Sequence, residues 1–115
     1  MDEATKLVST RKFAEAVSIL SEAVGRDGSN RELRLMLMQS AALAKNWPVA
    51  AAQVPLVSPF PDSESVPMFY AAISLYETGR LTDAREILSR ALPRLTKSPF
   101  VEEYATRIIG PRSGS

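Results

Sequence analysis

The chain has 115 residues, of which 45% are hydrophobic and 23% are charged, as in an ordinary globular domain. Fourteen basic residues against thirteen acidic residues leave a net charge of +1, which gives no electrostatic case for a nucleic-acid or anionic-membrane partner. The chain contains no cysteine and no histidine, so it cannot form disulfides and lacks the side chains of most zinc sites and of Cys–His and Ser–His–Asp catalysis.

The N-terminal part of the sequence predicts three helices. A short helix is expected over about residues 3–10, and a second helix is expected to begin near Phe13. The stretch RELRLMLMQSAALAK (31–45) has apolar residues three or four positions apart, which predicts a third helix. Ser29 and Glu32 have the spacing of a capping box at its start.

The next predicted helix begins at Trp47 and meets a proline at position 55. Pro55 would remove a backbone hydrogen bond and clash one turn back, at a cost of about 3 kcal/mol if the helix continued. We therefore expect the helix to end near Val54 and residues 55–65 to form an extended connector. This interpretation leaves the packing role of Val57 open.

Three further helices are predicted in the C-terminal half. The stretch 67–79 carries a proline in its first turn and Gly79 as a stop signal. The stretch 81–92 has Thr82 as a candidate N-cap, and a last helix is expected over about 99–109. No stretch alternates with period two over a useful length, so the sequence predicts an all-α fold.

Apolar residues also recur with a spacing of 34 residues. Size and polarity are kept in four aligned columns across three copies, without a gap: Phe13, Trp47 and Leu81; Ala16, Ala50 and Ala84; Leu20, Val54 and Leu88; Ala23, Val57 and Ala91. A fixed period of this length is the signature of a helical repeat protein. The register places Trp47 as a wedge between the two helices of its pair, although a contact with a ligand is the alternative.

The stretch AAISLYETGRLTDAREILSRAL (71–92) resembles the consensus of the tetratricopeptide repeat (TPR) family. Ala72 falls at the small packing position of the first helix, Tyr76 lies one residue from the aromatic position, and Gly79 is the turn glycine. The second-helix positions are occupied by Ala84, Leu88 and Ala91. The resemblance covers about residues 3–109.

This resemblance implies a right-handed α-solenoid of antiparallel helix pairs over residues 1–110. Residues 111–115 are expected to be a disordered tail or a remnant of expression. In the TPR family, fixed positions of each first helix point into a concave groove. The residues that match them here predict a partner-binding groove formed by Leu35, Gln39, Val66, Phe69, Ile73 and Tyr76.

Further groove positions fall on Met1, Thr5 and Val8 in the first copy, and the last helix would add Phe100. An alternative interpretation of the stripe that contains Phe69 and Ile73 is that the last helix covers it. In that case the stripe belongs to the core and does not contact a partner.

We find no constellation of catalytic, cofactor-binding or metal-binding residues, so we expect a non-enzymatic protein–protein interaction module. Its groove would bind an apolar peptide or an amphipathic helix, as an adaptor or a small chaperone does. The alternative is a structural scaffold, a homo-oligomer that assembles end to end through its terminal helices. No apolar run approaches the roughly 18 residues of a spanning helix, and the absence of a signal peptide favours a cytoplasmic location.

Overall fold

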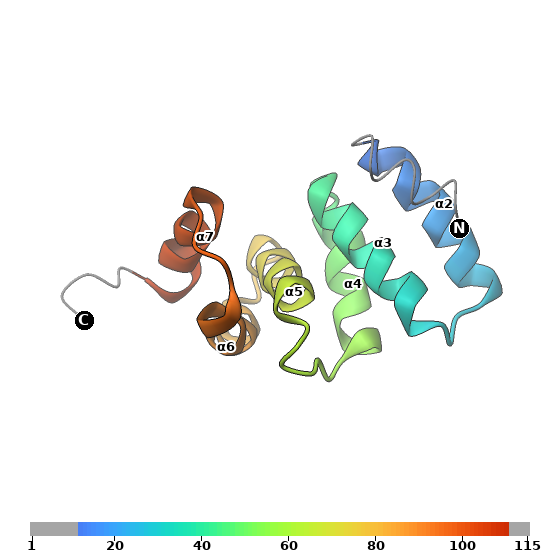
Figure 1. Ribbon diagram of the computed structural model, residues 1–115. Coiled ribbons are helices and arrows are strands. Elements are labelled where there is room, and N and C mark those ends of the chain that lie inside the picture. The colour runs from blue at the N-terminus through green and yellow to red at the C-terminus, as the bar shows by residue number, and fades with distance from the viewer. Residues whose placement is uncertain (1–11, 111–115) are drawn as a thin grey trace. The chain divides into compact units, whose positions relative to one another are not determined.

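The structure, a computed structural model, describes residues 12–110 (Figure 1). Within this range the fold is all-helical, with six α-helices, one short 3₁₀ helix and no strand, as the sequence predicts. The predicted helix over 3–10 and the predicted tail over 111–115 lie outside the described residues. The helices gather into two compact units, one ending at Pro59 and the other beginning at Phe60.

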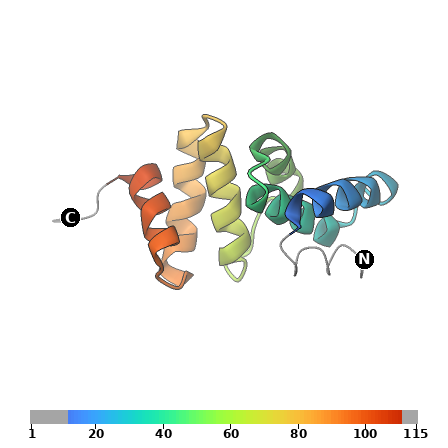
Figure 2. The same cartoon turned by 90° about the horizontal axis from the view of Figure 1, so that it is seen from above.

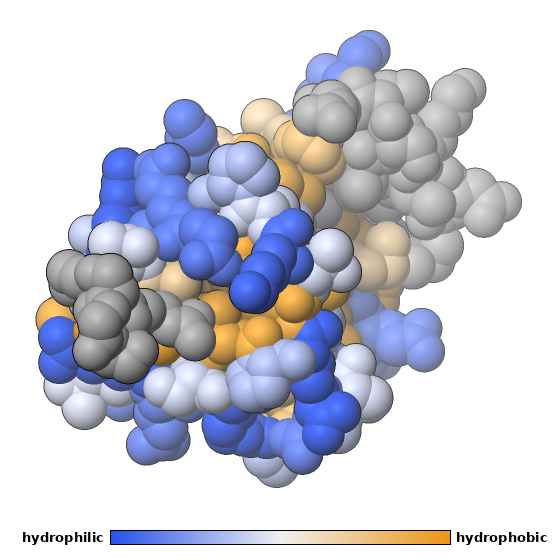
Figure 3. Space-filling model, turned by 60° about the vertical axis from the view of Figure 1, so that its left-hand side comes forward, coloured by the Kyte–Doolittle hydropathy of each residue, from blue (hydrophilic) through white to orange (hydrophobic). Residues whose placement is uncertain are grey.

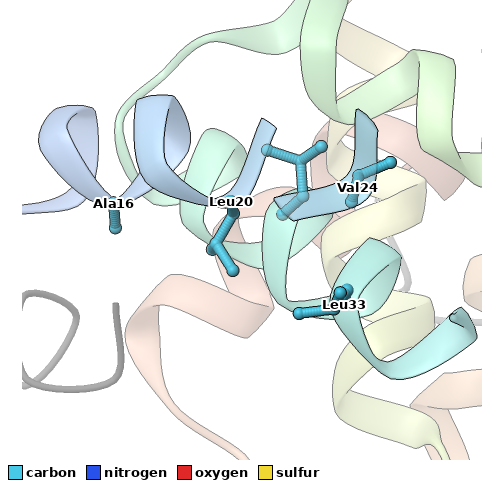
Figure 4. Close-up of a cluster of buried hydrophobic side chains, with 5 residues drawn as sticks. Ala16, Leu20, Val24 and Leu33 are labelled. Carbon is cyan, nitrogen blue, oxygen red and sulfur yellow. The ribbon is translucent and has the colours of Figure 1, made fainter. Parts of the chain in front are cut away.

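In its described residues the first unit contains three helices that pack in chain order, α2 against α3 and α3 against α4. Their bounds are Phe13–Arg26 for α2, Arg31–Leu43 for α3 and Trp47–Val57 for α4. Ala16, Leu20 and Val24 are spaced along the buried side of α2, and Leu33 of α3 lies below them in Figure 4. The core of this unit is therefore built from the apolar stripe that the spacing predicts.

Helix α3 begins with an Asn30 cap, and the predicted capping box at Ser29 and Glu32 is wrong. The Asn30 side chain accepts a hydrogen bond from the backbone N–H of Leu33 (3.2 Å). Ser29 instead donates to the Asp27 carboxylate (3.4 Å). Because the helix begins one residue later than the box requires, Glu32 lies too early in the first turn to complete it.

Helix α4 continues past Pro55 to Val57, so the predicted end near Val54 is wrong. Pro55 lies in the last turn, where it removes only one hydrogen bond. Two contacts stabilise the end of the helix, because Ser58 N–H donates to the Val54 carbonyl (3.0 Å) and Arg31 Nε donates to the Val57 carbonyl (2.8 Å). The Val57 side chain is 1% exposed, so Val57 is a packing residue.

The second unit consists of α5 (Ser65–Glu77), α6 (Leu81–Ala91), the 3₁₀ helix η1 (Leu92–Arg94) and α7 (Pro99–Ile109). Helix α6 packs against both α5 and α7, and the three helices lie side by side in Figure 2. The last helix has the predicted bounds. Helix α5 is shifted two residues toward the N-terminus from its predicted range.

The turn between α5 and α6 explains where both helices end and begin. Gly79 has a φ of +84°, which favours glycine, and Arg80 N–H donates to the Leu75 carbonyl (2.8 Å). Helix α6 begins at Leu81 after an Arg80 cap that makes no side-chain hydrogen bond, so the predicted Thr82 cap is wrong. The turn closes through backbone hydrogen bonds and through the Thr78 hydroxyl, which donates to the Ser74 carbonyl (2.9 Å) at the end of α5.

The 34-residue register is visible in the helix starts and in the burial. Helices α2, α4 and α6 begin at Phe13, Trp47 and Leu81. Two of the four columns are buried in all three helices: Ala16, Ala50 and Ala84; and Leu20, Val54 and Leu88. The column of Phe13, Trp47 and Leu81 is only partly buried. Trp47 is therefore less buried than a wedge between two helices would be.

Candidate functional site

The six residues predicted to line a groove divide between the two units. Leu35 and Gln39 lie on α3 in the first unit, and both side chains are partly buried. The other four residues lie on α5 in the second unit and follow one another along the helix.

The stripe on α5 changes from exposed to buried and back along the helix. Val66 is 51% exposed, whereas Phe69 and Ile73 are 4% and 1% exposed. Tyr76, at the end of the stripe, is partly buried. Only the two ends of the stripe are therefore in contact with solvent, and the residues between them are buried.

Helix α7 supplies the rings that contact Phe69. Phe100 meets it edge to face with ring centroids 5.5 Å apart, and Tyr104 meets it at 6.4 Å. Edge-to-face contacts place the positive edge of one ring against the negative face of the next. These contacts support the interpretation in which the last helix covers the middle of the stripe.

The rings continue as one cluster across the second unit. Tyr76 meets Tyr104 at 6.2 Å, Phe100 meets Tyr104 at 5.4 Å and Phe69 meets Tyr70 at 5.9 Å. We refer to these five residues as the aromatic cluster. It joins the first turn of α7 to the last turn of α5. Because each ring contacts at least one other ring, a shift of one ring would change the packing of its neighbours.

One end of the aromatic cluster is polar. Tyr104 OH donates to the Glu77 carboxylate (2.9 Å), and the Arg107 guanidinium lies 5.4 Å from the centroid of the Tyr104 ring. Arg107 also pairs with Glu103 at 2.6 Å. Burial, followed by the hydrogen bond to Glu77, raises the pKa of Tyr104 to about 12, so this residue stays protonated and remains a hydrogen-bond donor at neutral pH.

The other end of the aromatic cluster is apolar and open. Phe100 is 49% exposed although its ring contacts Phe69, and Val66 lies one helical turn before Phe69 on α5. Both residues belong to the first turns of their helices. We define the α5–α7 face as Val66, Phe69, Tyr76, Phe100 and Tyr104.

The predicted set lacks two residues that shape this face, Glu77 and Arg107. A signal for Arg107 was present, because Phe100, Tyr104 and Arg107 are spaced by four and three on one side of a helix. Glu77 had no comparable signal. Its role follows from the contact between α5 and α7, which only the folded chain brings about.

A second candidate is an open hollow of about 530 Å³ between α6, η1 and α7. Its lining combines apolar residues, among them Leu92, Leu95, Val101 and Ile109, with the polar residues Ser89, Lys97 and Glu102. Figure 3, which shows the molecule from the side of α7, displays apolar side chains bordered by hydrophilic ones. The hollow lacks the convergent polar groups that fix a small ligand.

The described residues contain neither a metal-binding group nor a membrane-spanning helix. Between residues 12 and 110 no group of three or more acidic side chains is placed to hold a metal ion. In the same range no helix is both long and apolar enough to cross a membrane. The α5–α7 face is therefore the strongest candidate site in the described part of the chain.

Comparisons with protein-family models, with curated proteins and with solved structures find no match for this chain.

Proposed function

We propose that the chain is a non-enzymatic protein-binding module whose α5–α7 face receives apolar side chains from a helical segment of a partner protein. We further propose that its helix pairs form a right-handed solenoid of the TPR kind. Two series of helix starts support this arrangement. The second helices begin at Phe13, Trp47 and Leu81, and the first helices begin at Arg31, Ser65 and Pro99, each with a step of 34 residues.

The observation that carries the binding proposal is the exposure of Val66 and Phe100. The two residues occupy equivalent positions in the register, 34 residues apart, and about half of each is in contact with solvent. The equivalent residue of α3 is Glu32, which is exposed and charged. The same position thus carries a glutamate in one copy and a large apolar side chain in the next two. Exposed apolar patches and aromatic residues are typical of protein-binding surfaces.

The geometry suits a partner helix with a short apolar stripe. An apolar side chain at one position would cover Val66 and Phe100, while the buried Phe69 supports them from below. About three turns beyond Val66 on α5, and one turn beyond Phe100 on α7, Tyr76 and the Tyr104–Glu77 pair offer polar contacts. An amphipathic segment with apolar residues three or four apart matches this arrangement.

The alternative, end-to-end assembly through α7, has weaker support. In α5 the register positions that pack inside the helix pair are Met68 and Ala72, both 0% exposed. The equivalent residues of α7 are Glu102 and Thr106, both exposed. A helix with a polar outer side is typical of a terminal cap, and burying Glu102 without a partner would be unfavourable.

The proposal can be tested with a displayed library of amphipathic helical peptides. Wild-type protein should select a subset with spaced apolar residues, and the double variant Val66→Ser/Phe100→Ser should lose at least about tenfold in affinity, as when central apolar contacts are removed. Leu43→Ser is the matched control, because Leu43 is an exposed apolar residue on α3 (37% exposed). Unchanged affinity in a folded double variant would contradict the proposed binding face.

A further inference from the structure

The polar end of the α5–α7 face carries a glutamate whose carboxylate is held in place. Glu77 is the last residue of α5 and is exposed, and its Oε2 accepts a hydrogen bond from the Tyr104 hydroxyl (2.9 Å). Tyr104 is only 8% exposed, and its ring packs against the rings of Phe69, Tyr76 and Phe100. An exposed carboxylate is thus anchored on a buried ring, so its position is fixed before a partner binds.

This carboxylate has no cationic partner in the described part of the chain. Within that part Glu77 makes no ion pair, and its second oxygen, Oε1, accepts no hydrogen bond. Arg107 pairs with Glu103 at 2.6 Å, and Arg80, three residues after Glu77, pairs with Asp83 at 3.1 Å. Both arginines are therefore already neutralised by acidic neighbours, and one negative charge remains at this end of the face.

The fold does not require a charge at this position. The residue of α3 that is equivalent to Glu77 in the 34-residue register is Leu43, which is exposed and apolar. An ion pair with an ordinary surface glutamate contributes little, because the side chain loses conformational entropy when it is held. The hydrogen bond from Tyr104 has already removed part of that freedom from Glu77. A cation that approaches Oε1 therefore binds a carboxylate that is preorganised.

We propose that the helical segment bound by the α5–α7 face carries a lysine or arginine that pairs with Glu77. This inference rests on the proposed function and adds the charge of the partner to it. Val66 and Glu77 are eleven residues apart on α5, roughly 16 Å along the helix axis. A segment that lies along α5 therefore places its cation about three turns from the apolar residue that covers Val66 and Phe100. An acidic residue at the same place would be repelled by Glu77.

Selection from a displayed library of helical peptides tests the charge. Peptides selected by the wild-type protein should be enriched in lysine or arginine about three turns from an apolar residue. Glu77→Gln should select the same apolar residues without that enrichment, because its amide oxygen still accepts the Tyr104 hydrogen bond but carries no charge. Glu77→Lys should favour acidic residues at the same place. Glu86→Gln is the matched control, since Glu86 is exposed on α6 and its substitution changes the net charge equally.

A double-mutant cycle on one selected basic peptide measures the pair. Glu77→Gln should weaken binding of this peptide about three- to tenfold and reduce its dependence on salt. The same substitution should have no effect on a peptide whose basic residue is replaced by glutamine. Glu86→Gln should leave the affinity for both peptides unchanged. Equal affinity of wild type and folded Glu77→Gln for the basic peptide, with the same salt dependence, would overturn the inference.

The double variant Val66→Ser/Phe100→Ser separates this inference from the proposed function. If it loses binding while Glu77→Gln keeps both affinity and selectivity, the binding face stands and the pairing with Glu77 is wrong. If the double variant binds as well as wild type, the proposed face is wrong and the pairing falls with it. A library from which the wild-type protein selects no helical peptide would overturn both.

Discussion

Replacing Phe69 by alanine decides whether the middle of the α5 stripe is core or binding surface. The ring is 4% exposed and meets the rings of Phe100, Tyr104 and Tyr70. Truncation of a buried phenylalanine removes its transfer free energy and leaves a cavity, which together cost about 3–5 kcal/mol. Part of that cost is the loss of edge-to-face contacts, each of which contributes roughly 0.5–1.5 kcal/mol.

Phe100→Ala is the matched comparison, because the same change is made at a ring that is 49% exposed. About half of the transfer term is then lost, with little cavity, and the expected cost is about 1–2 kcal/mol. The difference between the two variants should therefore be about 2 kcal/mol. A difference of this size is readily measured by urea unfolding.

The tyrosines and the tryptophan allow the effect to be localised. All three tyrosines lie in the second unit and Trp47 lies in the first, so near-ultraviolet dichroism of tyrosine and fluorescence of tryptophan report different parts of the chain. The Phe69→Ala change should shift the tyrosine signal to lower urea. A loss below about 1 kcal/mol, or a loss equal to that of Phe100→Ala, would refute the assignment of Phe69 to the core.

Three other predictions follow from named contacts. The Tyr104 hydroxyl should titrate with a midpoint near pH 12, and Tyr104→Phe should remove this step. Because the raised pKa favours the protonated ring in the folded state, Tyr104 stabilises the fold fully below pH 10. This contribution is lost as the pH rises through 12. Asn30→Ala should cost about 1 kcal/mol in thermal unfolding, whereas Ser29→Ala should stay within about 0.5 kcal/mol, and the reverse order would restore the capping box. Trp47→Ala should lower the free energy of unfolding by about 1–3 kcal/mol in the same assay, less than a full core truncation because the side chain is only partly buried. A larger loss would support the interpretation of Trp47 as a wedge between its two helices.

Most of the helices could be predicted because their signals are local. Periodic apolar residues and the glycine at position 79 lie within one or two turns of the boundaries that they set. The wrong caps at Ser29 and Thr82 are shifts of one or two residues between neighbouring candidates, whereas the wrong end of α4 arose because a distant contact decides the outcome. The end of α4 depends on burial of Val57 and on a hydrogen bond from Arg31, which is 26 positions away along the chain.

The candidate site was predictable in part for the same reason. The α5 stripe follows from helical spacing, which identifies residues that share a side but does not reveal what covers that side. The rings of Phe100 and Tyr104 cover Phe69 only because α7 returns alongside α5. Covering of this kind is a tertiary property, so both interpretations of the stripe remained open from the sequence.

The repeat register separates exposed apolar residues that need an explanation from those that do not. Isolated exposed apolar side chains are common on soluble proteins and carry little information. Three exposed apolar residues differ, because each occupies a position at which another copy of the repeat carries a charged residue. The counterpart of Val66 and Phe100 is Glu32, and the counterparts of Leu56 are Glu22 and Arg90. The same backbone position thus carries a charged residue in one copy and an exposed apolar residue in another, so the fold does not require the apolar residue there. Substituting the residue of the other copy is consequently the mildest available test of each of these residues, since the chain itself shows that the replacement fits a helix at that position.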